Sequence, residues 1–336
     1  PGASLGRAFV TGASGFLGYE IARQLAKAGV VTRALSRTGS LPGELADLGV
    51  TIVRGDLSNP LALREGMTGC DVVFHVAADV TMWRRRWTQS VSTNVIGTRN
   101  VVAESTRTGI RRLVHTSTAA TIGKPLIRCA TEPVMVDERS AYNFHELAMV
   151  YPHTKWLAEQ EVRRGIAEGL DAVVTHPAAI FGPRDWKHNT LPLLQAPKRK
   201  LAFAAPGGTR SICDVRDVAT AHLRAAELAP AGAHYILGGD CLSLSELLGL
   251  IAQLVGGSPP RLELPDRWVR ALGTTLDVMA DLTGKPPLLS SEMATQSTFR
   301  VRLSSAKAEA QLGYRSRPPR ESLRDAVAWF RQRGVL

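Results

Sequence analysis

The sequence predicts an α/β protein with a doubly wound parallel sheet and a smaller C-terminal lobe. Short apolar segments alternate with amphipathic segments over the first 180 residues of the 336-residue chain, without an internal repeat. Such alternation builds a parallel sheet through right-handed crossovers, with helices on both faces. The expected strands are 8–11, 31–35, 51–54, 72–76, 113–117 and 172–176, and the expected helices lie near 15–28, 60–68, 88–108 and 145–168.

Three glycines follow the first apolar segment and open the first helical one. Gly12, Gly15 and Gly18 have a G-x-x-G-x-x-G spacing, one residue longer between the first two glycines than the usual dinucleotide fingerprint. In a strand–turn–helix context, glycines let backbone N–H groups approach a pyrophosphate at the helix N-terminus. The pattern indicates a Rossmann-type nucleotide-binding unit, with a glycine turn that binds no ligand as the alternative.

The rhythm of the chain changes after Pro177, where further prolines mark a loop-rich region. A helix near 214–228 and a short strand at 234–237 then resume the earlier pattern. We therefore expect a dinucleotide-binding Rossmann domain over residues 1–180, to which residues 210–240 return.

The remaining segments, 181–209 and 241–336, are expected to form a substrate-binding lobe over the carboxyl ends of the strands, where ligands bind in such folds. Helical spacing is present near 243–255 and 320–333. The segment 266–284 has it as well, and we expect its apolar residues to face the protein rather than a membrane.

The composition, with 44% hydrophobic and 21% charged residues, is ordinary for a soluble globular protein. The net charge of +11 suggests nucleic acid as a partner, but the basic residues are scattered apart from Arg84–Arg86, and no nucleic-acid module accompanies them. A solvated basic surface is the preferred interpretation, and we expect no nucleic-acid partner. Arg84–Arg86 itself is interpreted as a solvated helix start, or as a rim that meets an anionic substrate or an acidic carrier protein.

No apolar run reaches the roughly 20 residues that span a bilayer, so no membrane span is expected. The cysteines form no C-x-x-C pair, which favours a reduced, cytoplasmic setting without a metal site. These cysteines are Cys70, Cys129, Cys213 and Cys241.

The residue at the end of the second expected strand indicates which dinucleotide the chain binds. An NAD-binding unit would carry an acidic residue there for the ribose hydroxyls, whereas this chain has Arg37. An arginine can pair with a 2′-phosphate through charge-assisted hydrogen bonds, so NADP(H) is favoured over NAD(H). A solvated arginine with relaxed cofactor choice is the alternative. Asp56, after the third strand, is placed either to contact adenine or to cap the helix near Pro60.

A tyrosine and a lysine stand four residues apart on one helical face, at Tyr151 and Lys155. A neighbouring ammonium stabilises phenolate and lowers the tyrosine pKa, which suits acid/base work between a carbonyl and an alcohol. The hydroxyl-rich segment Thr116–Ala120 ends the fifth expected strand, and a hydroxyl there can hold a substrate oxygen beside the phenol. Local turn chemistry is the alternative for that segment.

At this point the chain resembles the extended short-chain dehydrogenase/reductase family over nearly its whole length. The matching motifs are Thr11–Gly18, Gly55-Asp56-Leu57, His75–Ala78, Asn94–Thr98, Thr116–Ala120, Tyr151–Lys155, His176-Pro177, Phe181–Pro183 and Asp214–Ala219.

The resemblance implies catalytic roles for three residues: Tyr151 as acid/base, Lys155 as its pKa partner and ribose ligand, and Thr118 as the hydroxyl that orients the substrate. Ser117 is the alternative to Thr118. Asn94 and Asp217 are interpreted as structural. The expected cofactor-binding residues are Gly12, Ser14, Gly15, Phe16, Leu17, Gly18, Arg37, Asp56, Leu57, Ala77, Ala78, Thr116, Tyr151, Lys155, Pro177, Ala178 and Ile180.

Within that family the chain looks most like the dihydroflavonol reductase and 3β-hydroxysteroid dehydrogenase branch. We expect an NADPH-dependent ketoreductase acting on a bulky, largely hydrophobic or aromatic small molecule, with Trp83, Thr118, Phe144 and Trp186 at the substrate. Trp83 and Trp186 are alternatively lobe packing. A nucleotide-sugar epimerase with tightly bound NAD(P) and a non-catalytic NADP(H)-sensing regulator are the rival functions. The resemblance also allows a homodimer.

Overall fold

The computed structural model describes residues 5–124, 132–147, 149–200 and 202–336. Its main sheet has the strand order β11-β7-β5-β4-β1-β2-β3, and all neighbouring strands in it run parallel. All six strands predicted in the first 180 residues are present. The sheet consists of β1 (Arg7–Thr11), β2 (Val31–Ser36), β3 (Thr51–Arg54), β4 (Val72–His75), β5 (Arg112–Thr116), β7 (Ala172–Pro177) and β11 (His234–Leu237).

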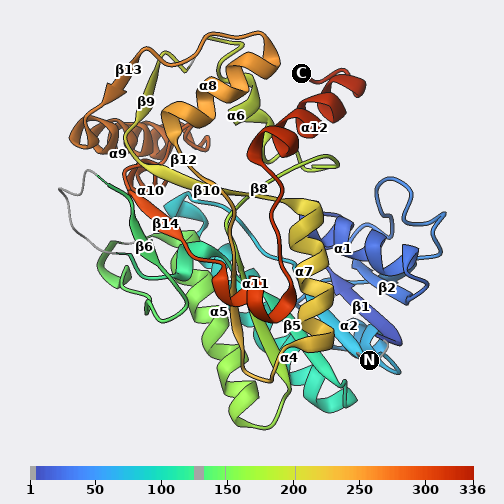
Figure 1. Cartoon of the computed structure of the whole chain (residues 1–336). Helices are drawn as coiled ribbons and strands as arrows, with labels where there is room; N and C mark the ends of the chain where they lie inside the picture. The colour runs from blue at the N-terminus through green and yellow to red at the C-terminus, as the bar shows by residue number, and fades with distance from the viewer. Residues whose placement is uncertain (1–4, 125–131, 148, 201) are drawn as a thin grey trace.

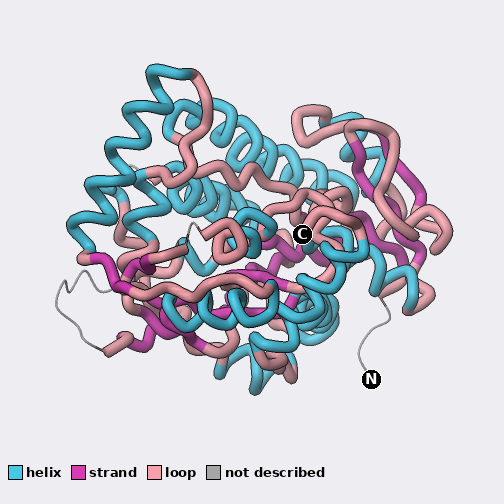
Figure 2. Tube along the Cα trace, turned by 90° about the horizontal axis from the view of Figure 1, so that it is seen from above, coloured by secondary structure: helices cyan, strands magenta, loops and turns pink. Residues whose placement is uncertain are grey.

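Helices cover both faces of this sheet (Figures 1 and 2). Side chains alternate across β1: Ala8 and Val10 belong to the core that includes α1 and α7, whereas Phe9 belongs to the core beneath α2 and α4. The helices are α1 (Phe16–Lys27), α2 (Pro60–Met67), α3 (Trp87–Ser90), α4 (Gly97–Thr108), α5 (Val150–Ala167), α6 (Leu191–Gln195), α7 (Val215–Leu228), α8 (Leu244–Val255), α9 (Asp266–Thr283), α10 (Ser291–Gln296), α11 (Ala306–Leu312) and α12 (Pro319–Gln332).

The helix predicted near 88–108 is divided into three parts. Between α3 and α4 the chain forms a π-helical turn at Val91–Ile96. Asn94 lies in this turn, where its amide bonds to the backbone of Asp79 (2.7 and 2.9 Å) and to the Thr154 hydroxyl (3.0 Å). The residue therefore ties the segment after β4 to α5, which agrees with the structural role expected for it. π-turns of this kind are frequent at functional sites.

The second half of the chain returns to the sheet and then builds the lobe. α7 packs on α1, and β11 pairs with β7 at the sheet edge. Short strands organise the region that the sequence indicated only as loop-rich, since they pair across long chain distances. They are β6 (Val134–Val136) with β14 (Val301–Leu303), β8 (Ala179–Phe181) and β12 (Cys241–Ser243) with β10 (Thr209–Asp214), and β9 (Ala204–Pro206) with β13 (Leu262–Leu264).

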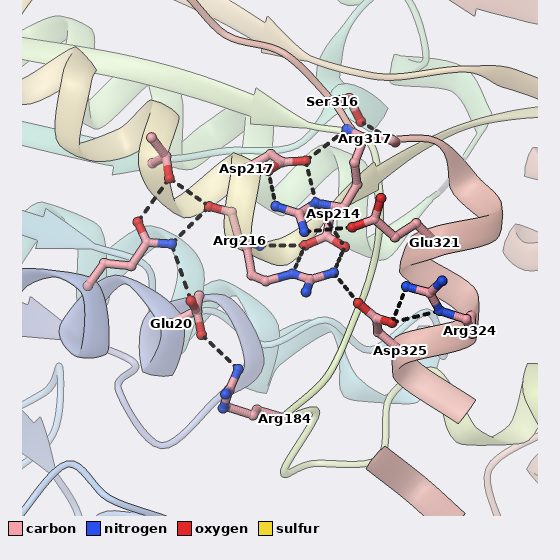
Figure 3. A network of polar contacts seen from close by, with 12 residues as sticks. Glu20, Arg184, Asp214, Arg216, Asp217, Ser316, Arg317, Glu321, Arg324 and Asp325 are labelled. Atoms are coloured by element: carbon pink, nitrogen blue, oxygen red, sulfur yellow. Dashed lines mark hydrogen bonds and ion pairs between the residues drawn. The ribbon is translucent and has the colours of Figure 1, made fainter. Parts of the chain in front are cut away.

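An ion-pair network joins α7 to the C-terminal segment (Figure 3). The buried Asp214 caps α7 and binds Arg216, which also reaches Asp325 of α12 at 2.8 Å. Asp217 receives Arg317 at 2.6 Å. Asp217 thus anchors the C-terminal segment to α7, which agrees with the structural interpretation of this residue.

The expectation that the apolar residues of 266–284 face the protein holds for Val269 and is wrong for most of the others. Trp268 and Leu282 of α9 are 61% and 82% exposed. The helix packs on α10 with its small side chains instead: a Cβ at Gly273 would stand 2.6 Å from the Cβ of Ala294. Only the side of α9 that carries small residues lets α10 approach this closely. The bulky apolar side chains of α9 therefore face outward.

Candidate active site

The glycine turn after β1 is built for close backbone approach. Gly12 has φ +82°, and a Cβ there would lie 2.7 Å from the backbone nitrogen of Ala77 at the end of β4. A Cβ at Gly18 would lie 2.3 Å from the Gly12 carbonyl oxygen. α1 begins after Gly15 with no side-chain cap and no acidic residue in its first turn. Its first N–H groups therefore suit an anionic group such as a pyrophosphate.

A cleft of about 970 Å³ opens beside this turn, at the carboxyl ends of the central strands. Every residue that the sequence predicted for cofactor binding lines it, and so does Thr118. The glycine turn, the carboxyl ends of several sheet strands and the start of α5 therefore line one cleft. These residues are Gly12, Ser14, Gly15, Phe16, Leu17, Gly18, Arg37, Asp56, Leu57, Ala77, Ala78, Thr116, Tyr151, Lys155, Pro177, Ala178 and Ile180.

Arg37 and Asp56 lie near each other at one end of the cleft. Two hydrogen bonds from Ser58, at 2.6 and 2.8 Å, lower the pKa of Asp56, and the Arg37 guanidinium lowers it further. The cap of α2 is Asn59, whose side chain accepts from the backbone nitrogen of Ala62. The helix-cap alternative for Asp56 is therefore wrong, because the neighbouring asparagine already fills that role.

Tyr151 and Lys155 lie in the first turns of α5. The Thr118 side chain lies close enough to the Tyr151 phenol to lower its pKa, and both residues line the cleft. Lys155 is buried, and its Nζ donates a 2.8 Å hydrogen bond to the carbonyl oxygen of Thr116, the last residue of β5. The three residues for which the sequence predicted catalytic roles therefore line the same cleft.

Burial dominates the ionisation of this pair. It raises the pKa of Tyr151, against the lowering effect of the Thr118 side chain, and the nearby Glu292 raises it further. Burial lowers the pKa of Lys155 to about 8, partly opposed by Glu159. The expected fall in the Tyr151 pKa is thus not found, because the cost of burying a phenolate exceeds the stabilisation around it. A raised pKa keeps the phenol protonated at neutral pH.

Glu292 is a residue that sequence reasoning missed. It comes from α10, yet its carboxylate accepts hydrogen bonds from the backbone nitrogens of Val150 (2.6 Å) and Tyr151 (3.3 and 3.4 Å). It thereby caps α5, which has no side-chain cap of its own. Burial raises the pKa of Glu292 to about 7. Because Glu292 lies more than a hundred residues from α5 in the chain, no local sequence pattern connects this cap to the helix.

A buried carboxylate holds the turn that carries Thr118. Glu159, one helical turn after Lys155, accepts a hydrogen bond from Ser117, and the Thr121 hydroxyl lies 2.6 Å from it. The same Thr121 hydroxyl lies 2.8 Å from the carbonyl oxygen of Thr118. Ser117 therefore points to a structural partner, and Thr118 is the hydroxyl that meets Tyr151.

Glu159, His176 and His234 are the group with metal-ligand spacing that we find among the described residues, with ligand atoms within 4.8 Å of one another. These atoms already have partners: the two histidine rings share a 3.1 Å hydrogen bond, and hydroxyls bind the carboxylate. That arrangement satisfies the cluster without an ion. Cys70, Cys213 and Cys241 are free thiols, and Cys129 lies outside the described residues.

Two aromatic residues expected at the substrate lie away from the cleft lining. Phe144 is buried in a cluster with Tyr142 and Phe299. Trp186 packs on Tyr19, with ring centroids 5.7 Å apart. Phe144 is thus a buried packing residue, and Trp186 is half-buried against other rings, which is the packing alternative for it.

Trp83 is half-buried beside Asp281 of α9 and does not line the cleft either. Of the expected substrate residues, the cleft therefore contains Thr118. The sequence did not predict the other polar residues that line the cleft, and only the run Arg84–Arg86 pointed to one of them. These residues are Asp79, Arg86, Gln89, Ser92, Thr93, Lys187, Asn189 and Thr190.

Comparison with known sequences identifies the family. The sequence model of the NAD dependent epimerase/dehydratase family matches residues 8–238. The chain belongs to this family. Among its relatives is a "putative dihydroflavonol 4-reductase" of Synechocystis, 32% identical over 98% of this chain and 95% of that protein. A "4-hydroxy-2-methyl-3-oxo-4-farnesyl-3,4-dihydroquinoline-1-oxide ketoreductase" of Stigmatella aurantiaca is 34% identical, covering 96% and 95%.

Solved structures agree with this family. The crystal structure of gox2253 has a TM-score of 0.83 and 32% identity, covering 98% of this chain and 99% of that one. UDP-glucose 4-epimerase of Thermotoga maritima, with a TM-score of 0.75 and 20% identity over 97% of this chain and 99% of that one, shares the fold. As a member of the epimerase/dehydratase family, the protein is an NAD(P)-dependent oxidoreductase of the extended short-chain type, acting on carbonyl or hydroxyl groups. Among the described residues, no helix is long and apolar enough to cross a membrane.

Proposed function

We propose that this enzyme is an NADPH-dependent ketoreductase for a bulky, largely hydrophobic or aromatic small molecule. The observation that carries the proposal is the contact between the Tyr151 phenol and the Thr118 hydroxyl, in the cleft that the glycine turn also lines. A carbonyl oxygen placed between these groups would accept hydrogen bonds from both. The named reductases among its full-length relatives support the same direction of chemistry.

When bound, a nicotinamide cofactor would supply the hydride for the carbonyl carbon. In this proposal Tyr151 donates its proton to the carbonyl oxygen, a role for which the phenol has to be protonated, as it is at neutral pH. Thr118 orients the oxygen. Lys155 is held by Thr116, and its ammonium stabilises the phenolate left behind.

The chain's own residues also support NADPH as the cofactor. Arg37 lines the cleft beyond β2, where no acidic residue of that strand end competes for the ribose. Gly12 and Gly18 line the same cleft and allow the pyrophosphate, which NADPH and NADH share, to approach the backbone.

A specific observation favours the rival epimerase. Arg86 and Lys187 line the cleft as well, and two cations would suit the phosphates of a nucleotide sugar. Steady-state assays separate the two functions. Consumption of NADPH with hydrophobic ketones supports the reductase. A cofactor that stays bound through purification, with no NADPH consumption on any ketone and turnover of nucleotide sugars, would overturn it. A regulator that only senses NADP(H) would bind the dinucleotide without any turnover.

A further inference from the structure

The helix α9 presents its apolar side to solvent. Its outward residues, called here the α9 face, are Trp268, Ala271, Leu272, Val278, Met279 and Leu282. At 3.6 residues per turn these positions fall within one arc of about a third of the helix circumference, so they share one side of α9. Two threonines, Thr274 and Thr275, complete this side, and it contains no charged acidic group.

This orientation is fixed by the inward side of the helix. Val269 and Ala280 are buried there, and Gly273 allows α10 to approach closely. The buried Asp277 accepts hydrogen bonds from the backbone nitrogen and hydroxyl of Ser291, at 3.0 and 2.5 Å. Rotating α9 to bury its bulky residues would break this bond set. The apolar exposure is therefore built into the packing of the lobe.

Exposed apolar residues continue beyond the helix, and basic residues surround them. Leu288 is 92% exposed. The Arg267 guanidinium lies 5.7 Å from the Trp268 ring, and Lys285 is exposed just after the C-terminal end of α9. At that same end Asp281 pairs with Arg84, whose side chain remains 60% exposed.

We propose that the α9 face docks on the surface of an anionic lipid bilayer. Apolar side chains can enter the boundary between headgroups and acyl chains, while the surrounding arginines and lysine meet phosphate groups. The net charge of +11 favours the same kind of surface. A second copy of this chain fits less well, because joining two such faces would bring like charges together.

The location of the face gives the docking a purpose. Arg84 and Arg85 pair with Asp281 of α9, and Arg86, the next residue, lines the cleft. The cleft mouth therefore lies close to the C-terminal end of the α9 face. If the proposed ketoreductase function holds, a hydrophobic ketone dissolved in the bilayer can reach the cleft without crossing much water. The docking itself does not depend on that function.

The test is co-sedimentation of the full chain with vesicles of phosphatidylcholine mixed with phosphatidylglycerol, and with vesicles of phosphatidylcholine alone. The double variant Met279→Glu/Leu282→Glu removes apolar contact and adds repulsion. Leu61→Glu is the matched control, since Leu61 is 71% exposed on the distant α2. Circular dichroism and thermal unfolding verify that each variant is folded.

We expect binding to the anionic vesicles that weakens with salt, and a loss of at least about tenfold in the double variant, with Leu61→Glu unchanged. Reduction of a short, water-soluble ketone should be the same in all three proteins, whereas reduction of a vesicle-dissolved ketone should fall in the double variant. Equal binding to both vesicle types, or no binding at all, overturns the proposal. So does a dimer in sizing experiments that the double variant converts to a monomer without any vesicle binding. Absence of all ketone reduction, with vesicle binding intact, would contradict the reductase alone.

Discussion

The Glu292 carboxylate lies 2.6 Å from the backbone nitrogen of Val150, so the C-terminal lobe caps the helix that carries Tyr151. The bond couples the two halves of the molecule at the reacting centre. A movement of the lobe would therefore displace the first turn of α5. The raised pKa of Glu292, to about 7, makes this coupling sensitive to pH.

Replacing Glu292 with glutamine tests the cap. Because the folded-state pKa lies above the unfolded value, the unfolded state loses its proton first, and wild-type stability from this group falls between about pH 4.5 and 7. The amide can still accept one hydrogen bond but does not titrate. We expect the Tm of Glu292→Gln relative to wild type to increase by about 2 °C or more over that window and to stay constant above it. A difference independent of pH would contradict a buried, titrating cap.

Arg37→Ala tests the choice of cofactor. We expect the wild type to prefer NADPH over NADH by at least about tenfold in kcat/KM, or about 1.4 kcal/mol, and the variant to lose most of this preference. The loss should come from a lower kcat/KM with NADPH, while kcat/KM with NADH should change little. Arg54→Ala is the matched control, since Arg54 is exposed at the end of β3 and does not line the cleft. Equal use of both cofactors by the wild type would remove the role given to Arg37.

The alkaline side of the pH profile reports on Lys155. Its pKa of about 8 lies below the ordinary lysine value, so the ammonium is present below that pH and lost above it. Since the charged form stabilises the phenolate, kcat/KM for reduction should fall roughly tenfold per pH unit above about pH 8. Lys155→Met should be slower throughout and should lack this limb. A wild-type profile that stays flat to pH 10 would show that Lys155 does not titrate in the reaction.

Much of the nucleotide site could be predicted because its signals are local. Gly12 and Gly18 are required by contacts within one turn, and Tyr151 and Lys155 share a helical face over four residues. The order of strands and helices then brings Arg37 and Thr118 to the same edge of the sheet. Chain patterns of this length are readable without knowledge of tertiary contacts.

The parts that could not be predicted depend on contacts between distant segments. Glu292 reaches α5 from another element, and nothing near it in the sequence resembles a cap for that helix. Phe144 and Trp186 were expected at the substrate but pack against other aromatic rings, because a sequence does not distinguish an aromatic residue that lines a pocket from one that packs in the fold. The exposure of α9 was also missed, since helical spacing reports an apolar side and not which side is packed.

The central claim is that Tyr151 donates the proton in an NADPH-dependent carbonyl reduction. The most direct measurement is steady-state NADPH oxidation by Tyr151→Phe, with NADPH binding measured in parallel and Tyr142→Phe, in the aromatic cluster outside the cleft, as control. We predict that kcat falls by about 10² to 10⁴ in Tyr151→Phe, with NADPH binding retained and Tyr142→Phe active. Ketone reduction at the wild-type rate by Tyr151→Phe would contradict the account.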